Sequence, residues 1–242
     1  GYTLEASSTN FGALTPGGAV YSSVTAGVLA STLIVSGLAP NTTYYFRVGA
    51  LNWNAAANYT TLSATSTLAN APAAPAYTAA TNVSLAAQWG ADDDPPGTAF
   101  TFQLSTASNF TGTIFSSVTV AVSALRAALA PDTTYYGRVF ATNNNGVLTS
   151  FSALGATATL ASSPVAVSPA FNPVFFSSLT ALFANGVPAN PDNTLYDVQL
   201  SSFSNFNVFY TSRTLNLAAA FTGLSPNTTY YAQAAAVNRS GI

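Results

Sequence analysis

The sequence predicts an all-β protein made of three successive small domains, and two observations support this. An eight-residue element that begins with leucine and contains proline, threonine and tyrosine occurs at 38–45, 129–136 and 224–231. Successive copies start 91 and 95 residues apart, which is the length of one small β domain and too long for a solenoid repeat. The segments around each copy alternate apolar and polar residues, which is the two-residue period of a β-strand.

Each copy has the same order of expected strands. A long alternating strand comes first and a shorter strand follows it, at 2–11 with 20–25, 100–110 with 114–119, and 196–206 with 208–214. In the repeated element, the leucine ends one strand, the proline turns the chain, and the first tyrosine opens another strand. That strand has apolar residues at alternate positions, as at Tyr44, Phe46 and Val48.

The Leu-x-Pro-x-Thr-x-Tyr run, followed by such a strand, resembles the tyrosine corner of fibronectin type III domains. In each copy, an asparagine also follows in register, at Asn52, Asn143 and Asn238. The resemblance implies tandem immunoglobulin-like, fibronectin type III β-sandwiches of the kind found in microbial extracellular repeat proteins. It also implies that the phenol of the corner tyrosine bonds to upstream backbone and ties two strands together across the end of the sandwich. The three corner tyrosines are Tyr44, Tyr135 and Tyr230.

The same resemblance predicts the domain boundaries. The family has a tryptophan on an early strand, a place that Trp89 and Phe183 occupy in the second and third copies. Hinges rich in alanine and proline lie at 70–76 and 162–164. We therefore expect a first domain at 1–69 without its opening strands, a complete domain at 70–161, and a third domain at 162–242 without its closing strand.

A sandwich without such strands exposes its core and an unpaired edge, so the two outer domains require an explanation. The simpler one is that these 242 residues are part of a longer repeat protein. The alternative is that strands from a neighbouring subunit complete the sandwiches, as in donor-strand exchange.

The composition argues against several functions. Only 5% of the residues are charged and the net charge is −2, whereas about 25% is usual for a soluble domain. There is no basic cluster for nucleic acid or anionic lipid, and no apolar run of about 18 residues that would span a membrane as a helix. Histidine and cysteine are absent, which removes the common general base, thiol nucleophile and transition-metal ligands. We expect no enzymatic activity and no cofactor.

Three sets of residues are candidates for binding. Asp92, Asp93 and Asp94 form the only acidic cluster, but their spacing matches no calcium loop and a solvated turn is favoured. Arg47 and Arg138 lie at equivalent positions and could recognise a ligand. The favoured interpretation is that each arginine side chain covers neighbouring aromatic side chains.

Trp53 lies in the loop after the corner strand, where it could stack on a sugar, anchor a partner, or be buried against the next domain. Sequons for N-glycosylation begin at Asn41, Asn58, Asn82, Asn109, Asn227 and Asn238.

The mean hydropathy of +0.33 with so little charge predicts a surface that associates, because isolated domains stay dispersed through charged surfaces. One module repeated with head-to-tail contacts forms open polymers. The leading hypothesis is a structural protein of an extracellular filament, fibre or surface layer, with copies of itself as partners. The alternatives are an adhesin or carbohydrate-binding repeat region, with surface glycans as partners, and a non-catalytic spacer of a large secreted enzyme.

Overall fold

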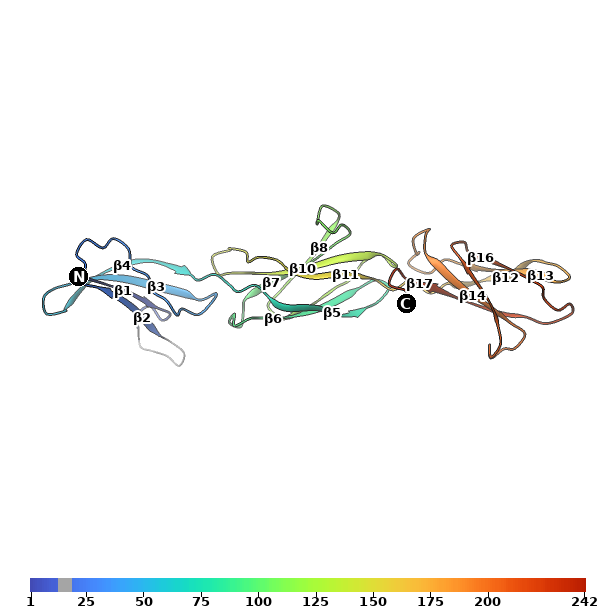
Figure 1. Ribbon diagram of the computed structural model, residues 1–242, viewed down its shortest axis with the longest axis horizontal. Helices are drawn as coiled ribbons and strands as arrows, with labels where there is room; N and C mark the ends of the chain where they lie inside the picture. The colour runs from blue at the N-terminus through green and yellow to red at the C-terminus, as the bar shows by residue number, and fades with distance from the viewer. Residues whose placement is uncertain (13–18) are drawn as a thin grey trace.

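A computed structural model describes residues 1–12 and 19–242, and every regular element within these ranges is a β-strand. Figure 1 shows three groups of strands that follow one another along the long axis of the molecule. The strands are β1 (Tyr2–Ser7), β2 (Val20–Thr25), β3 (Thr43–Leu51), β4 (Ala57–Ser66), β5 (Ala73–Ala80), β6 (Leu85–Gly90), β7 (Ala99–Ser105), β8 (Ile114–Thr119), β9 (Ser123–Arg126), β10 (Thr134–Thr142), β11 (Ser152–Ala158), β12 (Val165–Val174), β13 (Ser178–Ala184), β14 (Leu195–Ser201), β15 (Tyr210–Thr214), β16 (Ala218–Thr222) and β17 (Tyr231–Val237).

The strands form one sheet in the first unit and two sheets in each of the others. The first unit has the order β2-β1-β3-β4. The second unit pairs a sheet of order β11-β10-β7-β8 with one of order β5-β6-β9. The third unit pairs β15-β14-β17 with β12-β13-β16. The predicted all-β tandem sandwich architecture is confirmed.

The sequence repeat is also a repeat of strand register. The alternating strand of each unit pairs antiparallel with the strand after the corner, and equivalent residues face each other. The facing pairs are Glu5 with Arg47, Gln103 with Arg138, and Gln199 with Gln233.

The alternating strands end earlier than the sequence predicted, because the last residues of each predicted strand form a turn. Phe11, Phe110 and Phe206 have φ angles of 59°, 57° and 53°, in the left-handed region, which a strand does not use. The hydroxyl of Ser7 accepts hydrogen bonds from two backbone N–H groups of the first turn, at 3.2 and 3.0 Å. Ser105 begins the equivalent turn in the second unit with a bond of 3.1 Å. These hydroxyls replace ladder bonds and stop each strand.

The cores of the second and third units lie between their two sheets. Trp89 of β6 packs against Phe100 and Phe102 of β7, with ring centroids 5.9 and 6.2 Å apart. In the third unit Phe183 packs against Tyr196 at 5.1 Å. All five side chains are buried, and burial of each large apolar side chain stabilises the fold by about 1.5–3 kcal/mol.

The first unit has a more exposed apolar face. Residues 26–42 form no strand, although the equivalent part of the second unit contains β9, which pairs with β6. Leu29 and Ile34 in this segment are 95% and 78% exposed, and Leu62 of β4 is 50% exposed. No second sheet covers this face among the residues that the structure describes.

Candidate functional site: polar joints between successive sandwiches

The repeated element forms the same corner in all three units. The phenol oxygens of Tyr44, Tyr135 and Tyr230 each accept a hydrogen bond of 3.0 Å from the backbone N–H of the residue five positions upstream. Tyr44 and Tyr135 are buried, whereas Tyr230 is only partly buried. The bond holds the chain on both sides of the proline in a fixed shape.

The residue after the corner proline adopts the left-handed conformation in each unit. Asn41, Asp132 and Asn227 have φ angles of 39°, 42° and 53°. Asn and Asp tolerate this conformation better than other side-chain-bearing residues, which explains why they recur at this place. The corner therefore presents one polar side chain and one backbone carbonyl at the end of each sandwich.

At the end of the first unit, Asn41 is buried against the second unit. Its side-chain Nδ2 donates to Thr98 Oγ1 at 2.8 Å, and its Oδ1 accepts from the backbone N–H of Asn144 at 2.8 Å. The Asn144 side chain donates in turn to the Asn41 carbonyl oxygen at 3.0 Å. Next to it, Asn143 Nδ2 donates to the Thr67 carbonyl oxygen at 3.0 Å. We call this set of contacts the first joint.

The second unit contacts the third in the same way. Asp132 is buried; its Oδ2 accepts from Thr194 Oγ1 and its Oδ1 accepts from the backbone N–H of Arg239, both at 2.7 Å. Arg239 Nε donates to the Asp132 carbonyl oxygen at 2.8 Å. Asn238 Nδ2 donates to the Thr159 carbonyl oxygen at 3.1 Å. In this second joint, Asp132, Thr194, Asn238 and Arg239 take the places of Asn41, Thr98, Asn143 and Asn144.

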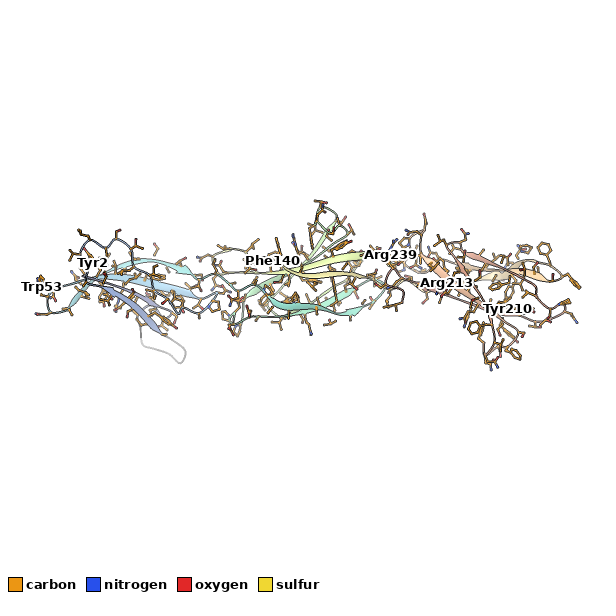
Figure 2. All side chains as sticks on the ribbon, in the orientation of Figure 1. Tyr2, Trp53, Phe140, Tyr210, Arg213 and Arg239 are labelled. Atoms are coloured by element: carbon orange, nitrogen blue, oxygen red, sulfur yellow. The ribbon has the colours of Figure 1, made fainter. Side chains whose placement is uncertain are left out.

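The loop that enters each joint is held in shape within its own unit. The side-chain Oδ1 of Asn143 accepts two backbone N–H groups of its loop at 3.0 and 2.8 Å. Asn238 makes the same pair of bonds at 3.1 and 2.8 Å, and Asn52 makes it at 2.9 and 2.9 Å. The first unit thus carries a preformed loop of the same kind, with Trp53 fully exposed at one end of the molecule (Figure 2).

Each joint also fixes its linker through one side chain. Asn190 Oδ1 accepts from the Ser162 backbone N–H at 2.6 Å, and its Nδ2 donates to the Ser162 carbonyl oxygen at 2.8 Å. In the first joint, Asp94 Oδ1 accepts from the Asn70 backbone N–H at 2.9 Å. The other carboxylate oxygen of Asp94 is buried without a hydrogen-bond partner in the described chain.

The acidic cluster is therefore part of the linker contact. Burial raises the pKa of Asp94, although the hydrogen bond from Asn70 opposes this. Asp92 and Asp93 lie in the adjoining turn with φ angles of 51° and 68°. Within residues 1–12 and 19–242 no group of three acidic, histidine or cysteine side chains is arranged to hold a metal ion.

The two equivalent arginines lie between aromatic rings. The Arg47 guanidinium is 4.1 Å from the Phe11 ring centroid and 4.0 Å from that of Tyr59. It also forms an ion pair of 2.7 Å with Glu5. Burial acts to raise the pKa of Glu5, but hydrogen bonds from Tyr59 and Arg47 and the charge of Arg47 lower it overall.

Arg138 lies in the same way between Phe110 and Phe151, 3.9 and 3.8 Å from the two ring centroids. Its Nε donates to Gln103 Oε1 at 2.8 Å. Both arginines thus pack against aromatic neighbours, and a ligand would have to displace an aromatic ring to reach the flat face of either guanidinium.

The six sequon asparagines fall into two groups. Asn41 and Asn238 are buried, and their amide nitrogens donate hydrogen bonds across the two joints. A glycan on either nitrogen is incompatible with the packed joint, so the structure argues against glycosylation at these two positions. The other four side chains reach solvent, fully or in part, and are Asn58, Asn82, Asn109 and Asn227.

The sequence did not point to Asn144, Arg239, Thr98, Thr194 or Asn190 as contact residues. The available signal was the asparagine that recurs in register at 52, 143 and 238, which we interpreted only as a fold marker. A recurring polar residue outside the alternation of the strands is the expected mark of an interface that recurs with the repeat.

No protein-family model matches the chain, and no curated protein matches it. Solved structures of fibronectin type III domains are similar to it. A two-domain segment of chicken tenascin superposes with a TM-score of 0.51 at 14% identity, over 70% of this chain and 92% of the tenascin segment.

Two further matches have lower TM-scores. The FN1–FN3 domains of chicken CNTN1 match 99% of this chain and 86% of their own, at 13% identity and a TM-score of 0.32. The FN5 domain of Drosophila Lar matches 37% of this chain and 94% of its own, at 20% identity and a TM-score of 0.31. At such identities the tenascin match shows a shared fold: this chain is folded as tandem fibronectin type III-type sandwiches.

Proposed function

We propose that this chain is a structural segment of an extracellular fibre, filament or surface layer, in which sandwiches are held end to end in fixed orientation. The observation that carries the proposal is the repetition of the joint: the corner residue, the loop asparagine and the facing threonine occupy the same places at both boundaries. A chain whose domains moved independently would need no such repeated contact.

The energy of each joint favours a fixed angle. A neutral hydrogen bond contributes about 0.5–1.5 kcal/mol and a bond to a charged group about 1.5–3 kcal/mol. The same four direct bonds link the corner or closing strand to the next unit in both joints, and the first joint adds a bond of 2.8 Å from Asn145 Nδ2 to Thr65 Oγ1. The corner side chain of each joint is buried. The joints therefore transmit orientation, which a load-bearing or spacing element requires.

The distribution of charge supports assembly. Four of the five arginines lie over aromatic rings or in the second joint: Arg47, Arg126, Arg138 and Arg239. Little charge is left to keep molecules apart, and Val24, Val118 and Leu125 on outer strands are more than 60% exposed. A surface of this kind associates with other molecules of similar polarity.

Two measurements test the proposal. Small-angle X-ray scattering of the chain should give the dimensions of one extended rod, because the joints fix the angles between units. Electron microscopy of the purified protein should show ordered linear or sheet-like assemblies. Dispersed monomers in native buffer, with scattering typical of flexibly linked domains, would contradict the structural role.

A second candidate function is carbohydrate binding, which the exposed indole of Trp53 favours. Titration with oligosaccharides, followed by intrinsic fluorescence, would detect stacking on this side chain. The Trp53→Ala variant should abolish any such signal while leaving buried Trp89 as an internal reference. If no oligosaccharide changes the emission of the parent protein, this second function is excluded for the sugars tested.

A further inference from the structure

The edge strands of this molecule differ in how they are protected against pairing with another chain. Unpaired backbone groups at a sheet edge invite a further strand, and proteins oppose this with bulges, proline, charged side chains or very short strands. β4, β5, β11 and β12 each carry at least one extra residue relative to the strand that they pair with. β5 and β12 also contain proline, and β9 and β16 have only four and five residues.

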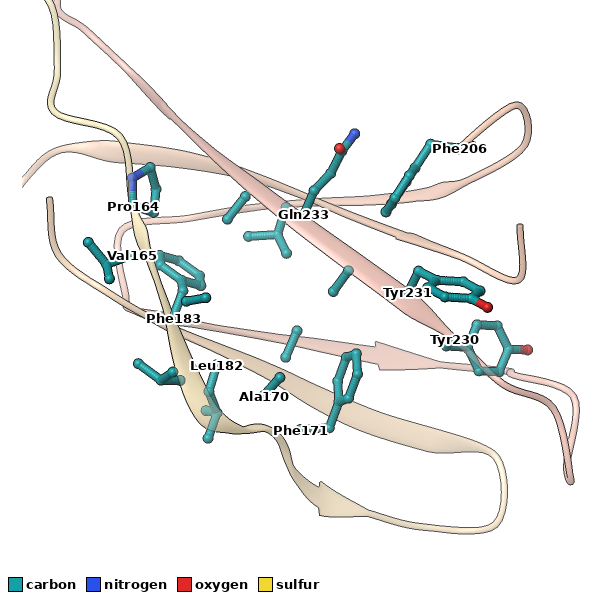
Figure 3. A pocket seen from close by; sticks show the side chains of 16 residues that line it. Pro164, Val165, Ala170, Phe171, Leu182, Phe183, Phe206, Tyr230, Tyr231 and Gln233 are labelled. Atoms are coloured by element: carbon teal, nitrogen blue, oxygen red, sulfur yellow. The ribbon is translucent and has the colours of Figure 1, made fainter. Parts of the chain in front are cut away.

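Charge protects β15 in the third unit, where Arg213 forms an exposed ion pair with Asp197 at 2.6 Å. β17 is a separate case, because it corresponds to β3 and β10, which pair with β4 and β11 on their outer sides. It borders an apolar groove of about 440 Å³, lined by Phe171 and Tyr230 among others (Figure 3), at a place where the other two units have a strand. Its edge is therefore not comparable with those of β2, β8 and β15.

Among the remaining edge strands of the described chain, β2 and β8 have none of these protections. Each has six residues in unbroken register with its neighbour. They read Val-Tyr-Ser-Ser-Val-Thr and Ile-Phe-Ser-Ser-Val-Thr, without proline, glycine or charge. The joints hold the neighbouring units at the two ends of the second sandwich, so its β8 edge lies on the flank of the molecule (Figure 1). The second unit has both of its sheets, so this open edge is a property of the fold.

An aromatic side chain holds each of these two edges against the core. The Phe115 ring of β8 packs edge-on against the buried corner residue Tyr135, with ring centroids 5.9 Å apart. Tyr21 of β2 packs in the same way against Tyr44 at 6.0 Å. In the third unit the equivalent residue is Tyr210, which is 49% exposed (Figure 2). Both unprotected strands are thus held in place before any partner binds.

The outward faces of β2 and β8 carry an aliphatic residue on either side of a serine, and all of these side chains are exposed. The outward-facing residues are Ile114, Ser116 and Val118 on β8, and Val20, Ser22 and Val24 on β2. The pattern is the same in both directions along the strand, which is what an antiparallel pair of identical strands requires. β15 lacks this symmetry, because Arg213 takes the place of the second aliphatic residue.

We propose that β8 pairs antiparallel with β8 of a second copy of this chain, and that β2 pairs in the same way with β2 of another copy. This pairing deepens the structural role proposed above, on which it rests, and supplies the lateral contact of the assembly. A two-fold axis perpendicular to the sheet sets Ser116 opposite Ser116 of the second copy, and Ile114 opposite its Val118. At the other edge, an equivalent axis sets Val20 opposite Val24 of the partner.

The facing residues match in chemistry along the whole outer face. Aliphatic side chains directly opposite each other make close contact in an antiparallel pair, and two facing hydroxyls can share a hydrogen bond. Gln103 Nε2 donates to Ser116 Oγ at 3.3 Å, which leaves the serine O–H free to donate to its counterpart. Neither strand carries a charged side chain, so two identical edges meet without repulsion. A second copy supplies the matching alternation on an edge that is open in the same way.

The two edges lie on opposite borders of the molecule in Figure 1, β2 at the lower border and β8 at the upper. One molecule can therefore pair with a different neighbour at each edge. Each contact joins identical surfaces about its own two-fold axis, so two such contacts in one chain do not close on themselves and extend the assembly into a layer.

Sedimentation velocity of the full chain over a range of concentrations tests the pairing. The parent should form oligomers larger than dimers. Ser116→Arg sets two like charges opposite each other at the two-fold axis and should leave dimers, joined through β2, as the largest species. The further change Ser22→Arg should give monomers, with association at each edge weakened roughly tenfold or more. Thr211→Arg, at the equivalent exposed position of the protected β15, is the matched control and should associate as the parent does.

Cysteine variants test the register. The chain contains no cysteine, so a single introduced thiol can form a disulfide only with another molecule. Ser116→Cys should give covalent dimers on oxidation with copper phenanthroline, because a residue on the axis faces its own counterpart at disulfide distance. Ile114→Cys, on the same face, is the control. Its counterpart lies four residues away along the strand, about 13 Å, so this variant should remain monomeric on a non-reducing gel.

A parent chain that stays monomeric at every soluble concentration would overturn the proposal, and so would equal cross-linking of Ser116→Cys and Ile114→Cys. Cross-linking of Ser116→Cys chains to Ser22→Cys chains but not to one another would show that the two-fold arrangement is wrong. Circular dichroism and thermal melting identify any arginine variant that fails to fold. Ser116→Cys replaces a single oxygen by sulfur and keeps the register testable in that case.

Electron microscopy of the protein with both Ser116→Arg and Ser22→Arg separates the edge pairing from the structural role. Ordered assemblies that persist in this variant would overturn the edge pairing and leave the structural role standing. Conversely, cross-linked Ser116→Cys dimers from a chain whose scattering is typical of flexibly linked domains would contradict the fixed joints and leave the edge pairing standing.

Discussion

The two joints have the same architecture, with an acid and an amide exchanged between two positions. At the corner, the first joint has Asn41 and the second has Asp132. At the linker, the first joint has Asp94 and the second has Asn190. Each joint thus contains one buried acid and one buried amide, but the acid contacts different partners in each.

The consequences of the exchange differ, because the acids differ in how well they are satisfied. Both Asp132 oxygens accept hydrogen bonds, and the Arg239 guanidinium lies 4.0 Å away. Asp94 has one bonded oxygen and one buried oxygen without a partner. Asp132 therefore strengthens the second joint. Asp94 weakens the first joint, because a buried polar group without a hydrogen-bond partner costs about 1–3 kcal/mol.

The largest effect is expected from Asp132→Ala. It leaves the buried Thr194 hydroxyl and the Arg239 backbone N–H without their acceptor, so the second joint should lose about 3 kcal/mol. Scattering should then show a bend or flexibility between the second and third units, and the amides of the Arg239 loop should exchange faster. The matched variant Asn41→Ala should weaken the first joint by about 1–2 kcal/mol. Equal losses at the two joints would contradict the assigned role of the charge.

Asp132→Asn should have a smaller effect, because it converts the second corner to the residue of the first. The amide keeps an acceptor for the Arg239 backbone N–H and loses the charge-assisted part of the contact, about 1 kcal/mol. Hydrogen exchange of the loop measures the change. The parent joint should weaken with added salt more than the variant joint does; the same salt response in both would speak against an electrostatic contribution.

Asp94→Asn should stabilise the first joint by roughly 1 kcal/mol, because the new amide can donate to the Asn70 carbonyl as Asn190 donates to Ser162. The pKa of Asp94 is raised in the folded chain, so the folded state binds its proton more tightly than the unfolded state does. Stability from this group is fully present below the unfolded pKa of about 4 and is lost as pH rises toward the folded pKa.

The advantage of the Asp94→Asn variant should therefore grow as pH increases through that window and then level off. Chemical unfolding followed by Trp89 fluorescence, at several pH values, measures it. A variant advantage that is constant with pH would show that the carboxyl titrates alike in both states.

The smallest effect is expected from Glu5→Gln, which gives the first unit the residue type found at Gln103 and Gln199. The pKa of Glu5 is lowered in the fold, so its contribution is present above the unfolded pKa of about 4.3 and is lost as pH falls through the folded pKa. The free energy of unfolding of the variant should be about 0.5 kcal/mol lower than that of the parent at neutral pH. The glutamine does not titrate, so this position should add no pH dependence to the stability of the variant. Hydrogen exchange of β1 at pH 7 and pH 3 compares the two proteins.

The fold was predictable from local patterns, and the joints were not. Alternation along each strand, the spacing of the corners and the large apolar side chains at Trp89 and Phe183 all follow from short segments. The joint partners are far apart in sequence: 103 residues separate Asn41 from Asn144, and 107 separate Asp132 from Arg239. Single polar residues at such distances leave no periodic signal, and only the comparison of one copy with the next could have identified them.

Strand ends were also beyond the sequence pattern. The predicted alternating strands end at Phe11, Phe110 and Phe206, but serine hydroxyls earlier in each copy form turns that stop the strand. Those phenylalanines serve other contacts: in the first two units they stack on Arg47 and Arg138. Alternation gives the face of a residue and does not distinguish a strand from the turn that follows it.

The preformed asparagine loop has a consequence for how such a chain can change in length. Each unit holds its corner and its loop in shape by bonds within itself, so both halves of a joint are present before two units meet. A gene duplication that copies one whole repeat unit therefore also copies both contact surfaces of a joint, the corner and the asparagine loop. Repeat number can then vary by recombination without the selection of any new interface.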